Sequence, residues 1–341
     1  MSKTILVTGG AGFIGSRFVQ YLLDHYPEYK IVILDALTYA GSTDNLPVGK
    51  NRQVDFWYGN VCNSDLVSTL TATSDIVVHF AAETHVTRSI YDNRIFFETD
   101  VLGTQSVANA VLRHAGRIER FIHISTSEVY GTARTEKMDE AHPLEPSSPY
   151  AAAKCGADRL VASYVTTYGI PAVIVRPFNT FGPFQHLEKL IPRFITSAIL
   201  GEPLTIHGDG TAARDFIYVE DVCRAVDLIM HAGAEPVIGE VFNVASGKHR
   251  SIVEIADDII RLTGIDPALK SHLPDRPGQV LRHTGNASKL ARTLDWHPAT
   301  DWIQGLQTTI DWFRSNRTFW QNQVWMRSIE ITLPDGGTVR H

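Results

Sequence analysis

Short apolar runs alternate with longer amphipathic segments through the first half of the chain. The short runs are rich in Val and Ile, as in parallel strands that are buried on both faces. They predict strands over residues 4–8, 31–34, 76–80, 120–124 and 172–176. Between them apolar residues recur at spacings of three and four, which predicts helices over residues 12–26, 93–115 and 148–168. This alternation predicts an α/β fold in which about six units form a doubly wound, Rossmann-type parallel sheet.

The alternation becomes irregular after residue 177. Helix, strand and turn patterns then follow at residues 190–200, 204–207, 208–210 and 275–278. We predict a Rossmann domain over residues 1–177 and a smaller α/β lobe with a C-terminal tail over residues 178–341. Residues 220–245 are expected to return to the large sheet, because the run at 241–244 has the pattern of a further strand.

Composition narrows the class of protein. Of the 341 residues 44% are apolar, which is enough for a large buried core. The net charge of −6, with scattered Lys and Arg, argues against a nucleic-acid partner. Cys62, Cys155 and Cys223 lack metal-ligand spacing, which predicts free thiols in the cytoplasm and no metal site. No apolar run reaches the ~20 residues of a membrane span, so no membrane partner is expected.

A glycine-rich turn lies between the first strand and the first helix. Gly9, Gly12 and Gly15 have the spacing G-x-x-G-x-x-G, which lets backbone approach a pyrophosphate at a helix N-terminus. Asp35 ends the second strand about 20 residues after Gly15, where a carboxylate accepts hydrogen bonds from the adenosine ribose. That carboxylate would repel a 2′-phosphate, and Ala36 follows it rather than arginine. The turn and Asp35 therefore predict an NAD site. The alternatives are an NADP site and a glycine-rich turn that binds no ligand.

A tyrosine and a lysine mark the start of the helix over residues 148–168. Tyr150 and Lys154 are four residues apart, so both side chains share one face. An ammonium close to a phenol stabilises the phenolate and lowers its pKa towards neutrality. Hydroxyl residues 125–127 end the preceding strand, at the sheet edge where ligands bind. Tyr-x-x-x-Lys alone is usually structural, but in this context Tyr150 is a candidate base that takes a proton from a sugar hydroxyl.

Longer motifs extend the argument. Thr-Ser-Glu-Val-Tyr-Gly stands at 126–131 and Ser-Ser-Pro-Tyr-Ala-Ala-Ala-Lys at 147–154, and further matching segments are 37–41, 80–89, 188–192, 214–215 and 275–278. With these motifs the chain resembles the extended short-chain dehydrogenase/reductase family from about Ile5 to Asp311. Within the family it is most similar to the nucleotide-sugar 4,6-dehydratases, of which the dTDP-glucose enzymes are the nearest.

The resemblance implies a reaction and a set of site residues. The sugar is oxidised at its fourth carbon, water is eliminated across the fifth and sixth, and hydride returns to the sixth. Catalytic positions are Tyr150, Lys154, Thr126, Glu128 and Ser127. NAD contacts, besides Tyr150 and Lys154, are Gly9, Gly12, Phe13, Ile14, Gly15, Asp35, Asn60, Val61 and Ala81. The nucleotide-diphosphate sugar is held by Thr84, His85, Asn179, Lys189, Leu190, Arg214, Asn243 and Arg276.

Three positions depart from this family pattern. Ser127 stands where the dTDP-glucose enzymes carry the aspartic acid that protonates the departing hydroxyl, and serine is a feeble acid. The Thr-Ser-Glu version resembles GDP-mannose 4,6-dehydratases and UDP-glucuronate decarboxylases, so Glu128 is expected to return the proton itself. Asn60 and Asp100 stand where the family usually has Asp and Asn, and the sequence offers no reason for either exchange.

Other functions share much of this pattern. A nucleotide-sugar 4-epimerase or a UDP-glucuronate decarboxylase uses the same glycines and Tyr150, although an epimerase has no essential use for Glu128. A non-catalytic NAD-binding sensor is the alternative outside enzymes. The helices over 93–115 and 148–168 are expected to pair with their copies in a homodimer, as in relatives, and the tail over 312–341 has no predicted role.

Overall fold

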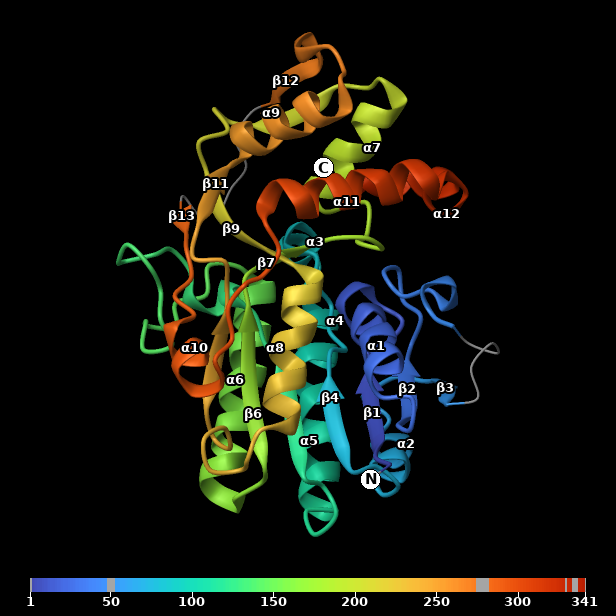
Figure 1. The fold of residues 1–341 in the computed structure, drawn as a ribbon, viewed down its shortest axis with the longest axis vertical. Coiled ribbons are helices and arrows are strands. Elements are labelled where there is room, and N and C mark those ends of the chain that lie inside the picture. The colour runs from blue at the N-terminus through green and yellow to red at the C-terminus, as the bar shows by residue number, and fades with distance from the viewer. Residues whose placement is uncertain (1, 48–52, 274–281, 329, 333–336, 341) are drawn as a thin grey trace.

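The computed structural model describes residues 2–47, 53–273, 282–328, 330–332 and 337–340. Its centre is a seven-stranded sheet in the order β10-β6-β5-β4-β1-β2-β3, in which all neighbours are parallel (Figure 1). The strands are β1 (Thr4–Thr8), β2 (Lys30–Asp35), β3 (Val54–Tyr58), β4 (Ile76–His79), β5 (Arg120–Ile124), β6 (Ala172–Pro177) and β10 (Val241–Val244). The direction of winding reverses between β1 and β4, and in such sheets this crevice is where a dinucleotide binds. The predicted Rossmann-type fold class is confirmed.

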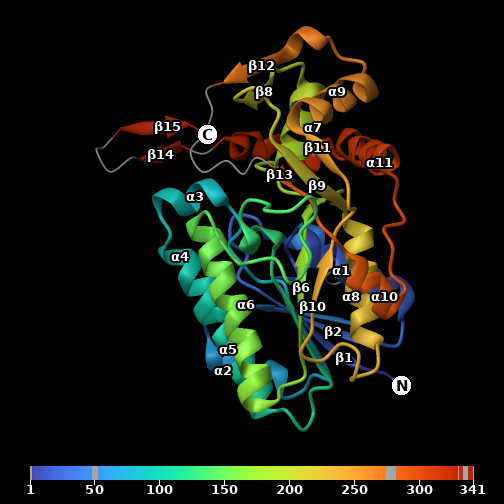
Figure 2. The ribbon, with the colours of Figure 1, turned by 90° about the vertical axis from the view of Figure 1, so that its left-hand side faces the viewer.

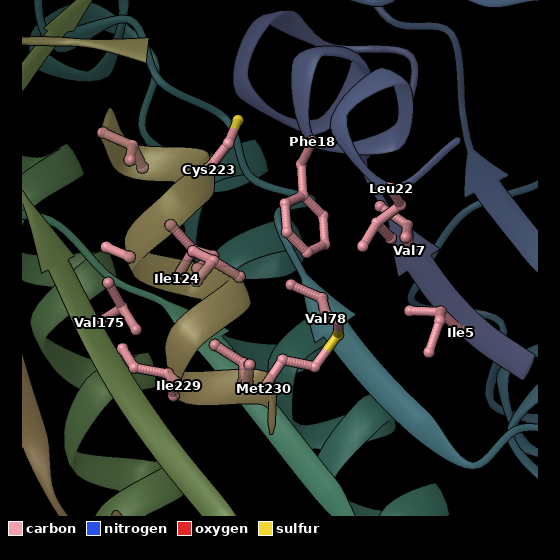
Figure 3. Packing of buried hydrophobic residues seen from close by; sticks show 14 of the residues in the cluster. Ile5, Val7, Phe18, Leu22, Val78, Ile124, Val175, Cys223, Ile229 and Met230 are labelled. Atoms are coloured by element: carbon pink, nitrogen blue, oxygen red, sulfur yellow. The ribbon is translucent and has the colours of Figure 1, made fainter. Parts of the chain in front are cut away.

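Helices cover both faces of the sheet. On one face lie α1 (Phe13–His25) and α8 (Val219–His231), which contact each other. In the core on this face Phe18 lies beside Val78, and Ile229 lies beside Val175 (Figure 3). The other face carries α2 (Ser64–Thr71), α5 (Thr104–Arg113) and α6 (Pro149–Tyr168), whose apolar residues pack with Leu6 and Val77 of the sheet (Figure 2). Adjacent residues of one strand thus enter opposite cores, which is why the strands are apolar throughout.

Two local features differ from the sequence prediction. β3 was not predicted, because it is an edge strand whose last residues, Trp57 and Tyr58, are exposed. The helix predicted over 93–115 consists of α4 (Arg94–Phe96), the π-helical segment η2 (Phe97–Gly103) and α5. A π-helical turn widens the helix locally, and such segments are frequent at functional sites.

A second hydrophobic core lies beyond the carboxyl ends of the sheet strands (Figure 1). Phe194, Ile255, Leu306 and Trp320 are among its buried members. Its helices are α7 (Leu190–Leu200), α9 (Ile252–Thr263), α11 (Trp302–Ser315), α12 (Arg317–Trp320) and η5 (Gln321–Arg327). The strands of this part of the chain are β7 (Asn179–Phe181), β8 (Leu204–His207), β9 (Ala213–Tyr218), β11 (His249–Ser251), β12 (Lys270–Leu273) and β13 (Arg282–His283), and the first three contribute buried side chains to the core.

The remaining elements are short. They are α3 (Val86–Tyr91), α10 (Ser288–Leu294), η1 (Thr43–Asn45), η3 (Ser127–Tyr130), η4 (Pro267–Leu269) and the hairpin of β14 (Glu330–Thr332) and β15 (Thr338–Arg340). Within the described ranges, no helix combines the length and the apolar character needed to cross a membrane.

Candidate active site

The glycine-rich turn packs too tightly for side chains at two of its predicted positions. Gly9 has φ +69°, and a Cβ on it would lie 2.5 Å from the backbone nitrogen of Ala81. A Cβ on Gly15 would lie 2.2 Å from the carbonyl oxygen of Gly9, whereas one on Gly12 would lie 3.3 Å from that oxygen. Phe13 and Ile14 are the first residues of α1, so the turn brings bare backbone to the helix N-terminus. This is the geometry that binds a pyrophosphate.

Asp35 braces this turn from the end of β2. Its Oδ2 accepts a hydrogen bond from the backbone N–H of Ala11 at 2.9 Å, and its Oδ1 accepts one from Leu37 at 2.8 Å. Burial raises the pKa of the carboxyl group, and these two bonds counteract part of that effect. Each carboxylate oxygen keeps one further lone pair, so the group remains an acceptor for a ribose hydroxyl.

The adjacent loops carry the other predicted cofactor positions. Ala81 follows β4 and contacts Gly9. Asn60 follows β3, and its Oδ1 accepts a hydrogen bond from the backbone N–H of Cys62 at 2.8 Å. Val61 is buried in the hydrophobic core that α2 and α5 share with the sheet. Along the loop after β2, residues 37–42 line a pocket of about 420 Å³ together with residues of the C-terminal tail such as Trp325.

The end of β5 supplies the hydroxyl and carboxyl groups. Thr126 caps η3, because its Oγ1 accepts a hydrogen bond from the backbone N–H of Glu128 at 3.2 Å. Ser127 is almost completely buried at 1% exposure, while the Glu128 side chain is 20% exposed. The cap therefore holds Thr126 and Glu128 together at the carboxyl edge of the sheet.

The first turn of α6 places Tyr150 and Lys154. Ser148 caps this helix, and the backbone N–H of Tyr150 donates to Ser89 Oγ at 3.1 Å. The Lys154 ammonium donates to the carbonyl oxygen of Ile124, the last residue of β5, at 2.8 Å. The two side chains come from one helix face as predicted, but Lys154 is anchored to the sheet.

The ionisation of Tyr150 differs from the sequence prediction. Burial raises the pKa of its phenol, the negative charge of Asp100 raises it further, and a hydrogen bond with Thr126 lowers it. The negative charge of Glu128 also raises this pKa. The prediction of a pKa lowered towards neutrality is therefore wrong for this structure, because the phenol is enclosed and two carboxylates act on it.

A buried histidine that sequence reasoning missed faces Glu128. His283 on β13 is fully buried, and its Nδ1 lies 3.9 Å from Glu128 Oε1. Burial lowers the pKa of His283 to about 4, although Glu128 raises it, so the imidazole is neutral near pH 7. Arg214, one of the predicted phosphate contacts, is the neighbour of His283 in the pairing of β9 with β13, so its residue lies on the Glu128 side of the site.

A second cluster joins the loop after β4 to the start of α7. The buried Glu188 carboxylate accepts a hydrogen bond from the Tyr39 hydroxyl at 3.2 Å and lies 3.1 Å from the Lys189 ammonium and 3.3 Å from His85 Nε2. Burial raises the pKa of Glu188, but Lys189 and the histidines outweigh it, so the pKa lies below its ordinary value. The Lys189 ammonium also donates to the carbonyl oxygen of Thr84 at 2.8 Å.

This cluster brings together three of the predicted substrate positions, Thr84, His85 and Lys189. A fourth, Leu190, follows Lys189 as the first residue of α7. Tyr39, His186 and Glu188 belong to it but were not predicted as site residues. The only signal for them was that Tyr39 and Glu188 lie inside the family motifs at 37–41 and 188–192.

The other predicted substrate positions differ in their surroundings. Asn179 begins β7 and is half-buried. Asn243 is fully buried: its Oδ1 accepts from the Tyr130 hydroxyl at 2.7 Å, and its Nδ2 donates to the carbonyl oxygen of Met138 at 3.1 Å. The prediction that Asn243 binds the sugar is therefore corrected, because these contacts within the protein occupy its amide group. Arg276 lies outside the described residues.

No group of three or more metal-ligating side chains occurs among the residues that the structure describes. The site combines four features: the glycine-rich turn at the N-terminus of α1, the Asp35 carboxylate at the ribose position, the Tyr-x-x-x-Lys motif of α6, and the Thr-x-Glu motif after β5. Together they define a dinucleotide-binding enzyme of the extended short-chain dehydrogenase/reductase type.

Comparison with known proteins makes the assignment narrower. A family profile described as GDP-mannose 4,6 dehydratase matches residues 6–309, and the chain belongs to this family. It is 40% identical over 322 residues to dTDP-glucose 4,6-dehydratase of Streptomyces niveus, covering 93% of this chain and 94% of the relative.

Solved structures agree. The crystal structure of the dTDP-glucose 4,6-dehydratase DesIV from Streptomyces venezuelae with NAD bound has a TM-score of 0.89 and 38% identity, over 94% of this chain and 99% of that one. UDP-glucose 4-epimerase of Thermotoga maritima has a TM-score of 0.85 and 28% identity, over 92% of this chain and 99% of that one.

Proposed function

We propose that the chain is an NAD-dependent nucleotide-sugar 4,6-dehydratase in which Tyr150, Thr126 and Glu128 act on the sugar. The observation that carries this proposal is that the buried phenol of Tyr150 hydrogen-bonds Thr126, whose Oγ1 also accepts the backbone N–H of Glu128, at the end of β5. Tyr150 as the base for a hydroxyl proton and Glu128 as the base for a C–H proton can thus act on the same sugar ring. Oxidation followed by elimination requires both bases.

The residues of the crevice fit NAD. Gly9 and Gly15 leave no room for side chains where the pyrophosphate would approach the N-terminus of α1, and Asp35 is an acceptor for the adenosine ribose. Phe13, Ile14, Asn60, Val61 and Ala81 would complete the contacts. When bound, NAD supplies the acceptor for the hydride of the fourth carbon and the donor of a hydride to the sixth.

In the oxidation, Tyr150 removes the proton of the sugar's fourth hydroxyl. The hydroxyl of Thr126 hydrogen-bonds the same sugar oxygen. Because this hydroxyl also hydrogen-bonds the Tyr150 phenol, it keeps the sugar oxygen beside the phenol. Lys154, held by the carbonyl oxygen of Ile124, contributes the positive charge that favours the phenolate.

In the elimination, Glu128 removes the proton of the fifth carbon, which the neighbouring ketone has made acidic. The hydroxyl of the sixth carbon leaves as water and needs one proton. Ser127 is too weak an acid and is almost completely buried, so Glu128 returns the proton that it has taken. One carboxyl group thereby serves in turn as base and acid.

The sugar nucleotide is held by the half of the chain after residue 177. Lys189, Asn179 and Arg214, with Thr84 and His85 across the crevice, offer donors suited to phosphate oxygens and hydroxyls. In this division residues 1–177 with β10 bind the dinucleotide, and residues 178–341 bind the substrate.

The test is a product assay with a panel of UDP-, dTDP-, GDP- and CDP-sugars, followed by mass spectrometry. A dehydratase removes the mass of water, a decarboxylase removes carbon dioxide, and an epimerase leaves the mass unchanged. Loss of water from at least one sugar supports the proposal. An unchanged mass with a changed sugar configuration, or no turnover with intact NAD binding, contradicts it in favour of an epimerase or a sensor.

We also propose a homodimer in the cytoplasm, formed through α4, η2, α5 and α6. The helices α4, α5 and α6 lie together on one side of the molecule (Figure 2). Large apolar side chains of α4 and η2 are exposed there. They include Ile95 at 41%, Phe97 at 43% and Leu102 at 54% exposure. A monomer rarely exposes a cluster of such residues unless a partner covers it.

A further inference from the structure

A buried carboxyl group lies behind the catalytic tyrosine. Asp100 is in the π-helical segment η2 and has 0% exposure. Its Oδ1 accepts a hydrogen bond from the backbone N–H of Glu83 at 2.8 Å. Its Oδ2 is buried and has no hydrogen-bond partner. A buried charge with an unpartnered oxygen is costly, so its presence calls for a physical reason.

The position of Asp100 follows from the packing of η2 on α6. Phe96, four residues before Asp100, packs against Tyr150 with ring centres 6.3 Å apart. Val101 packs in the same small cluster, which places this stretch of helix against the first turn of α6. Asp100 therefore lies on the catalytic side of its helix.

Three charged or titratable groups act on Asp100 or feel its charge. Glu83 comes from the loop after β4, and Tyr150 and Lys154 come from α6. Burial raises the pKa of Asp100 to about 7, while the Lys154 ammonium lowers it and Glu83 raises it. Lys154 also feels Asp158, which is itself paired with Arg176.

The consequences for catalysis have a definite sign. Burial lowers the pKa of Lys154 and raises that of Tyr150, so both groups resist the charged forms that oxidation needs. A negative Asp100 favours the ammonium, but it disfavours the phenolate. Ionised Asp100 thus moves the ionisation of Tyr150 and that of Lys154 to higher pH.

We propose that Asp100 is a positioning residue for the oxidation step: its buried carboxylate, on the part of η2 that packs against the first turn of α6, places a negative charge beside Tyr150 and Lys154 and thereby sets the pH range in which the sugar is oxidised. The residue acts through the ionisation of Tyr150 and Lys154 and does not touch the substrate. The inference rests on the role of Tyr150 in the proposed function.

The test is Asp100→Asn, which keeps the shape and the acceptor for the Glu83 N–H but removes the charge. We expect both limbs of the pH profile of kcat/KM to move to lower pH, by on the order of one unit. A residue with a merely structural role changes the height of the profile and leaves its limbs in place. Unmoved limbs, or limbs that move apart, overturn the proposal.

Stability gives a readout that does not depend on turnover. A carboxyl group whose pKa is raised on folding stabilises the fold below its unfolded pKa and loses that contribution as pH rises through its folded value, here about 7. The free energy of unfolding of Asp100→Asn relative to the unaltered chain should therefore increase between about pH 4, near the unfolded pKa, and about pH 7, and level off above it. A constant difference across this range contradicts a buried, titrating carboxyl group.

Glu98→Gln is the matched control. Glu98 lies in the same helical segment, but its side chain is 40% exposed and pairs with Arg94, so neither readout should move. Asp100→Ser provides a second uncharged variant if the asparagine form does not fold. A chain that turns over no sugar at any pH contradicts the proposed function, whereas turnover with unmoved limbs contradicts only the role of Asp100.

Discussion

Asp158 and Arg176 form a buried two-point ion pair beneath the candidate active site. The guanidinium donates from Nε to Asp158 Oδ2 at 2.8 Å and from a terminal nitrogen to Oδ1 at 2.9 Å. Ser125, at the end of β5, donates its hydroxyl to the same carboxylate at 2.7 Å, and Arg176 also donates to the Tyr130 hydroxyl. The pair thus ties α6 to the strand ends that carry the reacting groups.

Asp158→Asn should destabilise the fold by about 3–5 kcal/mol, because it leaves the buried guanidinium without its counter-charge. Chemical denaturation measures this loss. Glu98→Gln breaks an exposed pair and should cost at most about 1 kcal/mol. Equal effects of the two substitutions would show that the buried pair does not hold this part of the fold.

The same pair predicts a pH dependence. Burial alone would raise the pKa of Asp158, but the hydrogen bonds and charge of Arg176 lower it below its ordinary value. Its stabilising contribution is therefore complete above the unfolded pKa of about 3.9 and is lost as pH falls through the folded value. The free energy of unfolding of Asp158→Asn should therefore fall less steeply below about pH 4 than that of the unaltered chain. Denaturation curves measured at several pH values check this.

Glu128→Gln separates oxidation from elimination. The amide cannot take the proton of the fifth carbon, so water loss should fall by about 10²- to 10⁴-fold while the absorbance of the reduced nicotinamide still appears with substrate. Mass spectrometry and absorbance follow the two steps. Glu136→Gln, in an exposed position, is the control. If both steps of Glu128→Gln fall equally, Glu128 is not the base of the elimination.

Gly15→Ala tests the phosphate cradle. The added methyl group meets the Gly9 carbonyl oxygen at 2.2 Å, so the turn must shift, and we expect a loss of about 1–3 kcal/mol in stability with weaker NAD binding. Calorimetric titration and thermal unfolding measure the two effects. Gly116→Ala meets no atom within 4 Å and should change neither. Unaltered NAD affinity in Gly15→Ala would place the pyrophosphate elsewhere.

Leu102→Lys tests the proposed dimer. Leu102 is 54% exposed on η2, and a charge there should oppose association and give a monomer in light scattering. Leu228→Lys is the matched control, because Leu228 is 38% exposed on α8, across the sheet. A monomer in the unaltered chain, or a dimer that survives Leu102→Lys, removes the proposed interface.

Local sequence determined the parts of this protein that depend on neighbours in the chain. The glycine spacing from Gly9 to Gly15, the four-residue interval of Tyr150 and Lys154, and the apolar strands all follow from short-range backbone geometry and periodicity. The edge strand β3 was not predicted, because its last residues face solvent and its hydrophobic pattern is therefore weak.

Only the tertiary structure decided which distant side chains meet and how deeply they are buried. Glu188 reaches His85, Asn243 is occupied by Tyr130, and Asp100 lies close enough to Tyr150 to act on its pKa. Charge interactions and desolvation depend on the distances and burial that packing creates, so the ionisation of Tyr150 has a sign that the Tyr-x-x-x-Lys spacing alone does not contain.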